Sequence, residues 1–219
     1  MRRALFLLPG LLALFLAACG PDPDEELFED ALRLYRAREM QQALPLLEEV
    51  LDRDGGHARA LMLSAKIYFY RQEFARSAEF CERLLSDRPD HVGALLQLAR
   101  VHLGDEERTD EVLRLADRVL EIDSGNIEAW YLKGVAHERR EEIPEAFASF
   151  QGALHAGNNL ALVHRRLSLL YDAAKLREQS RMHAGLARLI APPDSPLEVP
   201  EGRSAPEPVA PEATTTTQP

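Results

Sequence analysis

The feature that most constrains this chain is a repeat of about 34 residues. One column of small residues recurs at steps of 34, 34, 35 and 34, and three further columns keep the same register. The single extra residue falls between Ala99 and Val112 in every column. Five copies of one structural unit are therefore expected. The columns are Ala31, Ala65, Ala99, Gly134, Ser168; Ala43, Ser77, Val112, Ala146, Ser180; Leu47, Cys81, Ala116, Phe150, Ala184; and Val50, Leu84, Val119, Ala153, Ala187.

Each copy is expected to be two short antiparallel helices, as residues 126–160 show best. Apolar and small residues recur there at helical spacing, first around Trp130 and then around Phe150. Gly134 and Ala146 are small where the two helices cross, and Pro144 lies at the start of the second helix, where a missing N–H costs little. One such pair cannot bury its own apolar stripe, so it needs neighbours of the same kind.

The period and the motif resemble the tetratricopeptide repeat family. The W-x2-LG-x2-Y pattern is matched by Trp130, Lys133, Gly134 and His137, and by Leu61, Ser64, Ala65 and Tyr68. The resemblance implies an all-α, right-handed superhelical solenoid of about five helix–turn–helix repeats over residues 27–191. The expected units are about 25–57, 58–91, 92–126, 127–160 and 161–192.

The N-terminus predicts export and a lipid anchor. Residues 1–18 carry two arginines and then an apolar run, which is typical of a signal peptide. Leu16-Ala17-Ala18-Cys19 resembles the bacterial lipobox, which implies acyl chains on Cys19; the alternative is an ordinary signal peptide with an incidental cysteine. Gly20 in place of Asp favours the outer over the inner membrane. Residues 19–26 are then the lipidated cysteine and a short tether, whose seven residues after Cys19 reach at most about 25 Å.

The C-terminal 28 residues, 192–219, differ from the rest. They hold eight of the 14 prolines and four consecutive threonines, and they have no aromatic residue. This composition predicts a disordered, solvated tail, with a proline-rich ligand or a spacer through the cell wall as alternatives. The helix before it exposes Leu186, Leu189 and Ile190, which either the tail or a dimer contact could cover.

Charge and motifs exclude several functions. Removal of residues 1–18 takes away two arginines and no acid, which leaves a net charge of −12 and argues against a nucleic-acid partner. No catalytic constellation, phosphate loop or paired-cysteine motif is present, so we expect neither enzyme activity nor a cofactor. His102 and His137 share a column, but two imidazoles make a weak metal site, and packing is the favoured role. Cys81, left without a partner, is expected to be a buried packing thiol.

The resemblance places a partner-binding groove on the first helix of each unit. Its basic row (Arg59, Lys66, Arg100, Arg139, Arg165) predicts an extended or acidic protein segment as the partner, and the alternative is that these cations pair with neighbouring acids such as Glu25 and Glu138. The expected groove residues are Phe28, Leu32, Tyr35, Arg59, Met62, Lys66, Phe69, Tyr70, Leu96, Arg100, Tyr131, Val135, Arg139 and Arg165.

The function expected from these features is that of an interaction scaffold or assembly factor, anchored by its lipid to a membrane of the bacterial envelope and facing the periplasm. An adaptor that recruits an envelope protease or a cell-wall hydrolase to its substrate is the alternative. An enzyme with an unfamiliar site on His102 and His137 is a third, weaker hypothesis.

Overall fold

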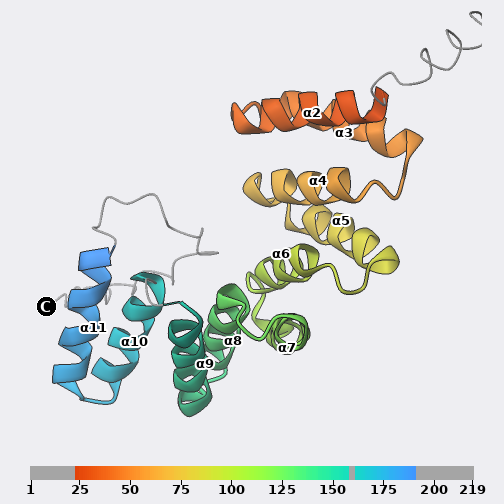
Figure 1. Ribbon diagram of the computed structural model, residues 1–219. Coiled ribbons are helices and arrows are strands. Elements are labelled where there is room, and N and C mark those ends of the chain that lie inside the picture. The colour runs from red at the N-terminus through yellow and green to blue at the C-terminus, as the bar shows by residue number, and fades with distance from the viewer. Residues whose placement is uncertain (1–22, 158–160, 191–219) are drawn as a thin grey trace, which may run out of the picture. The chain divides into compact units, whose positions relative to one another are not determined.

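The computed structural model describes residues 23–157 and 161–190, and every regular element in these ranges is helical (Figure 1). The predicted leader, Cys19 and the tail after residue 190 lie outside the described residues. The helices are α2 (Pro23–Arg36), α3 (Met40–Arg53), α4 (Ala58–Tyr70), α5 (Phe74–Asp87), α6 (Val92–His102), η1 (Glu106–Arg108), α7 (Thr109–Ile122), α8 (Ile127–Arg139), α9 (Ile143–Ala156), α10 (Ala161–Ala173) and α11 (Arg177–Ile190). The predicted all-α fold of helix–turn–helix repeats is confirmed.

The four columns of the sequence repeat form the interior of this fold. All of their members in the first four repeats are buried. In the last repeat Ser168, Ser180 and Ala184 are half-buried. The hydroxyls of Ser168 and Ser180 are 3.3 Å apart, so a hydrogen bond joins the two helices at this point of the last repeat.

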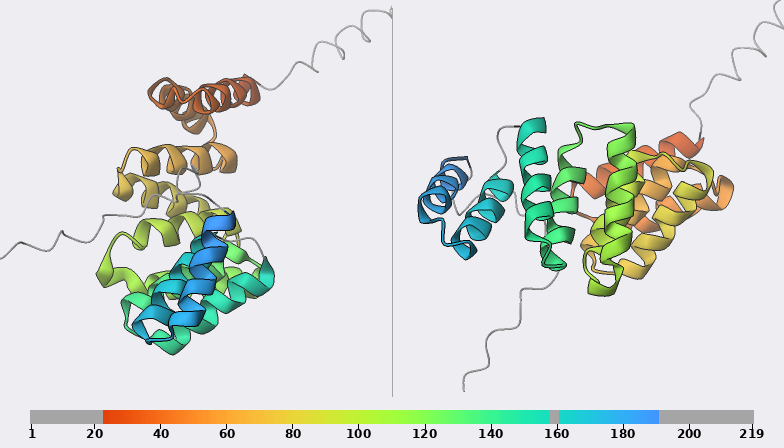
Figure 2. Two further views of the ribbon diagram at one scale, coloured as in Figure 1. Left: turned by 90° about the vertical axis from the view of Figure 1, so that its left-hand side faces the viewer. Right: turned by 90° about the horizontal axis from the view of Figure 1, so that it is seen from below.

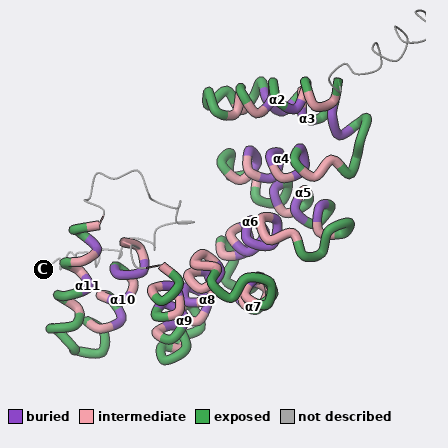
Figure 3. The backbone as a smooth tube through the Cα atoms, in the orientation of Figure 1, coloured by how far each residue is buried: buried purple, intermediate pink, exposed green. Residues whose placement is uncertain are grey.

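The chain divides into two compact units, residues 1–101 and 102–219. The first unit has a core around Leu47, Leu61 and Ile67, and the second has one around Phe150 and Leu167. Two further views show α10 and α11 side by side at the C-terminal end of the described chain (Figure 2). Buried and exposed residues alternate along each helix, as expected for amphipathic helices (Figure 3).

The turns within the repeats share one backbone conformation. Arg38, Gln72, Glu141 and Lys175 occupy the same repeat position and have φ between 60° and 64°. The next amide in each case bonds the carbonyl five residues earlier, as in Glu39 N–H to Leu34 O at 2.9 Å. This arrangement is a Schellman cap, which ends the first helix of the pair. In the third repeat, the short helix η1 accommodates the extra residue instead.

The turns between repeats are capped by side chains. His57 Nδ1 accepts a hydrogen bond from the Ala60 amide, and His91 Nδ1 accepts one from the Ala94 amide, both at 3.1 Å. In the fourth repeat Asn126 Oδ1 accepts from the Ala129 amide at 3.0 Å. The two histidines, 34 residues apart, therefore serve as helix N-caps, a role usually filled by Ser, Thr, Asp or Asn.

Cys81 is fully buried, and burial raises the pKa of its thiol to about 12. This burial confirms the prediction of a buried packing thiol. Because its pKa is raised, the thiol holds almost no reactive thiolate at neutral pH. Among the described residues, no helix is long and apolar enough to cross a membrane.

Candidate partner-binding surface

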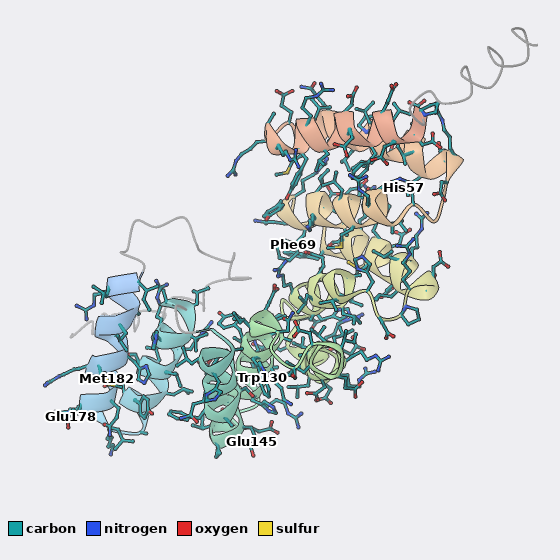
Figure 4. All side chains as sticks on the ribbon, in the orientation of Figure 1. His57, Phe69, Trp130, Glu145, Glu178 and Met182 are labelled. Atoms are coloured by element: carbon teal, nitrogen blue, oxygen red, sulfur yellow. The ribbon has the colours of Figure 1, made fainter. Side chains whose placement is uncertain are left out.

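Four aromatic side chains gather where α2 and α4 end and α5 begins. The ring centroids of Tyr35 and Tyr70 are 6.4 Å apart, those of Phe69 and Tyr70 6.1 Å, and those of Phe69 and Phe74 5.6 Å. Tyr70 is 54% exposed and Phe74 39%. We call these four residues the aromatic cluster, and Figure 4 shows Phe69 at its place near the end of α4. Exposed, mutually packed rings of this kind are typical of binding hot spots.

The repeat itself builds the cluster. Tyr35 and Phe69 occupy equivalent positions 34 residues apart, on the last turn of the first helix of their repeats. The Schellman caps at Arg38 and Gln72 end both helices immediately afterwards, so the rings stand at neighbouring helix ends. Burial, followed by the adjacent Tyr70 hydroxyl, raises the pKa of Tyr35. Tyr35 therefore keeps its proton at neutral pH and can donate a hydrogen bond.

Positive charge borders the aromatic cluster. Lys66 precedes Tyr70 by one turn of α4, which places the two side chains on the same face of the helix. Lys66 is half-buried, and it pairs with no acidic side chain of residues 23–157 and 161–190. The charge of Arg38 opposes the rise in the pKa of Tyr35, which shows that Arg38 also lies near the cluster.

The other cations of the predicted basic row are engaged within the protein. Arg59 forms ion pairs with Glu25 and, at 2.6 Å, with Glu29, and its guanidinium lies 4.1 Å from the centroid of the Phe28 ring. Hydrogen bonds to Glu29 and Glu25 raise the pKa of Arg59. The alternative interpretation, that basic residues pair with neighbouring acids, therefore holds for Arg59.

Arg100 and Arg139 also have protein partners. Arg100 donates to the side-chain oxygen of Gln97 at 3.3 Å. Arg139 donates to the carbonyl oxygen of Leu103, and desolvation lowers the pKa of its guanidinium. Arg165 is exposed on α10 and likewise makes an interaction within the protein. Of the five cations in the row, Lys66 is thus the one that the described residues leave without a partner.

Three predicted groove residues belong to the core instead. Phe28, Leu96 and Val135 are 3%, 9% and 5% exposed, so their side chains are not available to a partner. The side chains of these three residues face neighbouring helices rather than solvent. Leu32, Met62 and Tyr131 are half-buried, and the Tyr131 ring lies 6.1 Å from that of Phe150.

His102 and His137, which share a column of the repeat, each have their own partner. His102 Nε2 is 3.4 Å from Glu111, and His137 Nδ1 is 2.7 Å from Glu142. Within the described residues, no group of three or more His, Cys, Asp and Glu side chains could hold a metal ion.

Sequence reasoning missed a buried histidine pair. His164 Nδ1 and His183 Nδ1 are 2.8 Å apart, and His183 stacks on Tyr171 with a centroid distance of 5.2 Å. One imidazole must donate and the other must accept, which requires at least one neutral ring. Burial lowers the pKa of both, and His164 lowers that of His183 further. The replacement of the usual large apolar residue by His164 was the available signal.

A hollow of about 490 Å³ lies beside Trp130 in the second unit. The indole N–H donates to the carbonyl oxygen of Ser124 at 2.9 Å, and the ring lies against Gly152, where an added Cβ would be 2.7 Å away. The hollow is lined by Ser124, Gly125, Trp130, Gln151, Gly152, His155 and Ala156. It is open to solvent, and we assign no ligand to it.

Helical hairpins with four matching buried columns and an exposed aromatic cluster define a helical-repeat interaction protein. A family model described as "Tetratricopeptide repeat" matches residues 28–92 and 96–161, which is more than half of the chain. The protein belongs to the tetratricopeptide repeat family. Members of this family are generally non-catalytic scaffolds for protein–protein interaction.

Solved structures are similar over most of their length. MamA from Desulfovibrio magneticus RS-1 has a TM-score of 0.69 at 17% identity, with 78% of this chain and 97% of that chain covered. MamA AMB-1 has a TM-score of 0.60 at 25% identity, covering 76% and 91%. The thermophilic repeat protein TTC0263 from Thermus thermophilus has a TM-score of 0.62 at 19% identity, covering 78% and 93%. None of the curated proteins compared with this chain matches it.

Proposed function

We propose that this protein is a non-enzymatic interaction scaffold or assembly factor of the bacterial cell envelope. Acyl chains on Cys19 would hold it to a membrane, with the outer membrane favoured by Gly20, and the repeats would face the periplasm. The lipobox-like sequence of residues 16–19 supports the anchor, and the family supports the scaffold. The proposal for the site is carried by one observation, the exposed aromatic cluster of α2, α4 and α5.

The cluster suits a protein segment because it combines large apolar area with polar tips. Tyr70 and Phe74 offer ring faces, the Tyr35 and Tyr70 hydroxyls can bond a peptide backbone, and Lys66 can pair with a carboxylate. We therefore propose an extended segment with an acidic or C-terminal carboxylate near Lys66. The site is narrower than the full row of five cations, since Arg59 already pairs with two glutamates.

In-cell photocrosslinking tests this site. A photoreactive phenylalanine analogue at Tyr70 should give a discrete adduct, whereas the same analogue at Glu79, exposed on α5, should give none. Lys66→Glu should reduce the Tyr70 adduct several-fold, and Arg114→Glu, a matched change at an exposed arginine, should leave it unchanged. Equal adducts from positions 70 and 79 would remove the cluster from consideration. An unchanged adduct in Lys66→Glu would retain the cluster and reject the carboxylate.

A further inference from the structure

Each second helix of the first four repeats has, at four equivalent positions, an outer face of polar or small residues. Four positions of each helix lie on it, and nearly all are exposed. The large apolar exception is Ile122 on α7. The sixteen residues are Pro45, Glu49, Asp52, Arg53; Glu79, Arg83, Ser86, Asp87; Arg114, Arg118, Glu121, Ile122; and Ala148, Gly152, His155, Ala156.

The last helix reverses this pattern. The same four positions of α11 are Met182, Leu186, Leu189 and Ile190, with Met182 54% and Leu189 81% exposed. Their spacing of i, i+4, i+7 and i+8 places them on one side of the helix. Figure 4 marks Met182 on α11. We call these four residues the α11 stripe.

The face of α11 that corresponds to inter-repeat packing is charged. In α9, Phe147 and Leu154 pack against the next repeat, with the Phe147 ring centroid 4.7 Å from that of Tyr171. The equivalent residues of α11 are Arg181 and Arg188, both exposed. A following repeat would pack against the face of Arg181 and Arg188, so the α11 stripe is not the surface that such a repeat would cover.

We infer that residues 192–201 of the same chain cover the α11 stripe. Leu197 and Val199 are the large apolar residues of this segment, and in an extended chain residues i and i+2 point to the same side. The preceding Pro-Pro-Asp-Ser-Pro sequence, residues 192–196, is rich in turn formers and allows the chain to reverse after α11.

Charge and length fit this occupant. Asp194, Glu198 and Glu201 carry negative charge beside the apolar pair, opposite in sign to Arg181 and Arg188 on α11. Ten residues in a strand-like extended conformation reach roughly 33 Å at about 3.3 Å each, which exceeds the roughly 20 Å length of a 14-residue helix. Because the segment follows α11 directly, its effective concentration at the stripe is high without a tight intrinsic affinity.

Thiol labelling tests the inference in the mature-length chain carrying Cys19→Ser, in which buried Cys81 is unreactive. A cysteine probe in Leu189→Cys should react with a maleimide at least about five-fold more slowly than one in His155→Cys, the exposed equivalent position on α9. Adding Leu197→Asp with Val199→Asp should bring the Leu189→Cys rate up to that of His155→Cys. Val209→Asp, a matched change outside the segment, should leave the slow rate as it was.

Two outcomes would overturn the inference. Equal rates for Leu189→Cys and His155→Cys in the unaltered tail would show that nothing covers the stripe. The second is a slow Leu189→Cys rate that rises when the protein is diluted but does not change with Leu197→Asp and Val199→Asp. This result would show that a second copy of the chain covers the stripe. The inference does not depend on the aromatic cluster, which these variants leave intact.

Discussion

Gly134 on α8 faces Phe150 on α9, so the large side chain on one helix requires a small residue on the other. An added Cβ would lie 2.5 Å from the Phe150 ring. The corresponding pairs in the first two repeats are Ala31 with Leu47 and Ala65 with Cys81, so Phe150, the largest residue of its column, accompanies Gly134, the smallest of its own. Close packing leaves no empty space for either partner to grow, and the pair therefore has to be considered together.

Gly134→Ala should destabilise the second unit by about 1–3 kcal/mol, because the overpacking cost exceeds the helix propensity gain of about 1 kcal/mol. Urea unfolding followed by Trp130 fluorescence measures this. Gly185→Ala is the matched control, since a Cβ there meets nothing within 4 Å, and it should be neutral or stabilising. Adding Phe150→Leu to Gly134→Ala should restore part of the loss. Two substitutions that simply add their costs would refute this pairing of a large with a small residue.

The helices differ in what stabilises their contacts, and the α10–α11 pair differs most. This pair buries the imidazoles of His164 and His183, whose Nδ1 atoms are 2.8 Å apart, and half-buries the hydroxyls of Ser168 and Ser180. A buried polar pair is stabilising only while its protons match its hydrogen bonds. The last hairpin is therefore the element whose stability should depend most on protonation.

Acid should open α10 and α11 before the neighbouring hairpin. Burial lowers the pKa of His164 and His183 in the folded state, so unfolded histidines, with an ordinary pKa of about 6.5, bind protons first as the pH falls. The stabilisation is therefore complete above about pH 6.5, is lost progressively as the pH falls from there towards the lowered folded values, and changes no further below them. Hydrogen exchange, corrected for intrinsic rates, should show lower protection of α10–α11 at about pH 5 than at about pH 7.5, with α8 and α9 less affected.

The double variant His164→Leu with His183→Phe provides the control for this acid effect. It replaces both titratable rings by apolar side chains, and Phe at position 183 can still stack on Tyr171. Protection of α10–α11 in this variant should be the same at both pH values. A persistent loss in acid would place the acid-sensitive group elsewhere.

At the scale of the whole molecule, the repeat was predictable because packing imposes it at every turn. The buried columns, the helix pairs and the extra residue near η1 all follow from spacing. The turns at Arg38 and Gln72 were not predictable, because neither residue type signals a positive φ. Nor could spacing show that Arg59 meets Glu25 and Glu29 while Lys66 meets no acid among the described residues, since those outcomes depend on side-chain reach between repeats. The repeat period therefore predicts the helical scaffold, whereas the candidate site depends on individual side-chain contacts that the sequence does not show.

Attachment to a membrane is also a property of the whole chain, and the proposed lipid on Cys19 makes it testable. The chain after residue 18 carries a net charge of −12, which opposes attraction to anionic headgroups. One acyl chain binds a bilayer only marginally, whereas several chains hold a protein stably. Cys19→Ser should therefore shift the protein from the detergent phase to the aqueous phase in a detergent partition assay and abolish the mass increase of the N-terminal peptide.

Cys81→Ser is the matched control for this experiment, since it removes the other cysteine of the chain and should leave partitioning unchanged. If the Cys19→Ser protein stays in the detergent phase with residues 1–18 still attached, their apolar run holds it there, whereas a protein that stays there after loss of residues 1–18 would show that lipid on Cys19 is not the anchor. The two results differ in the mass of the N-terminal peptide, which identifies the anchor directly.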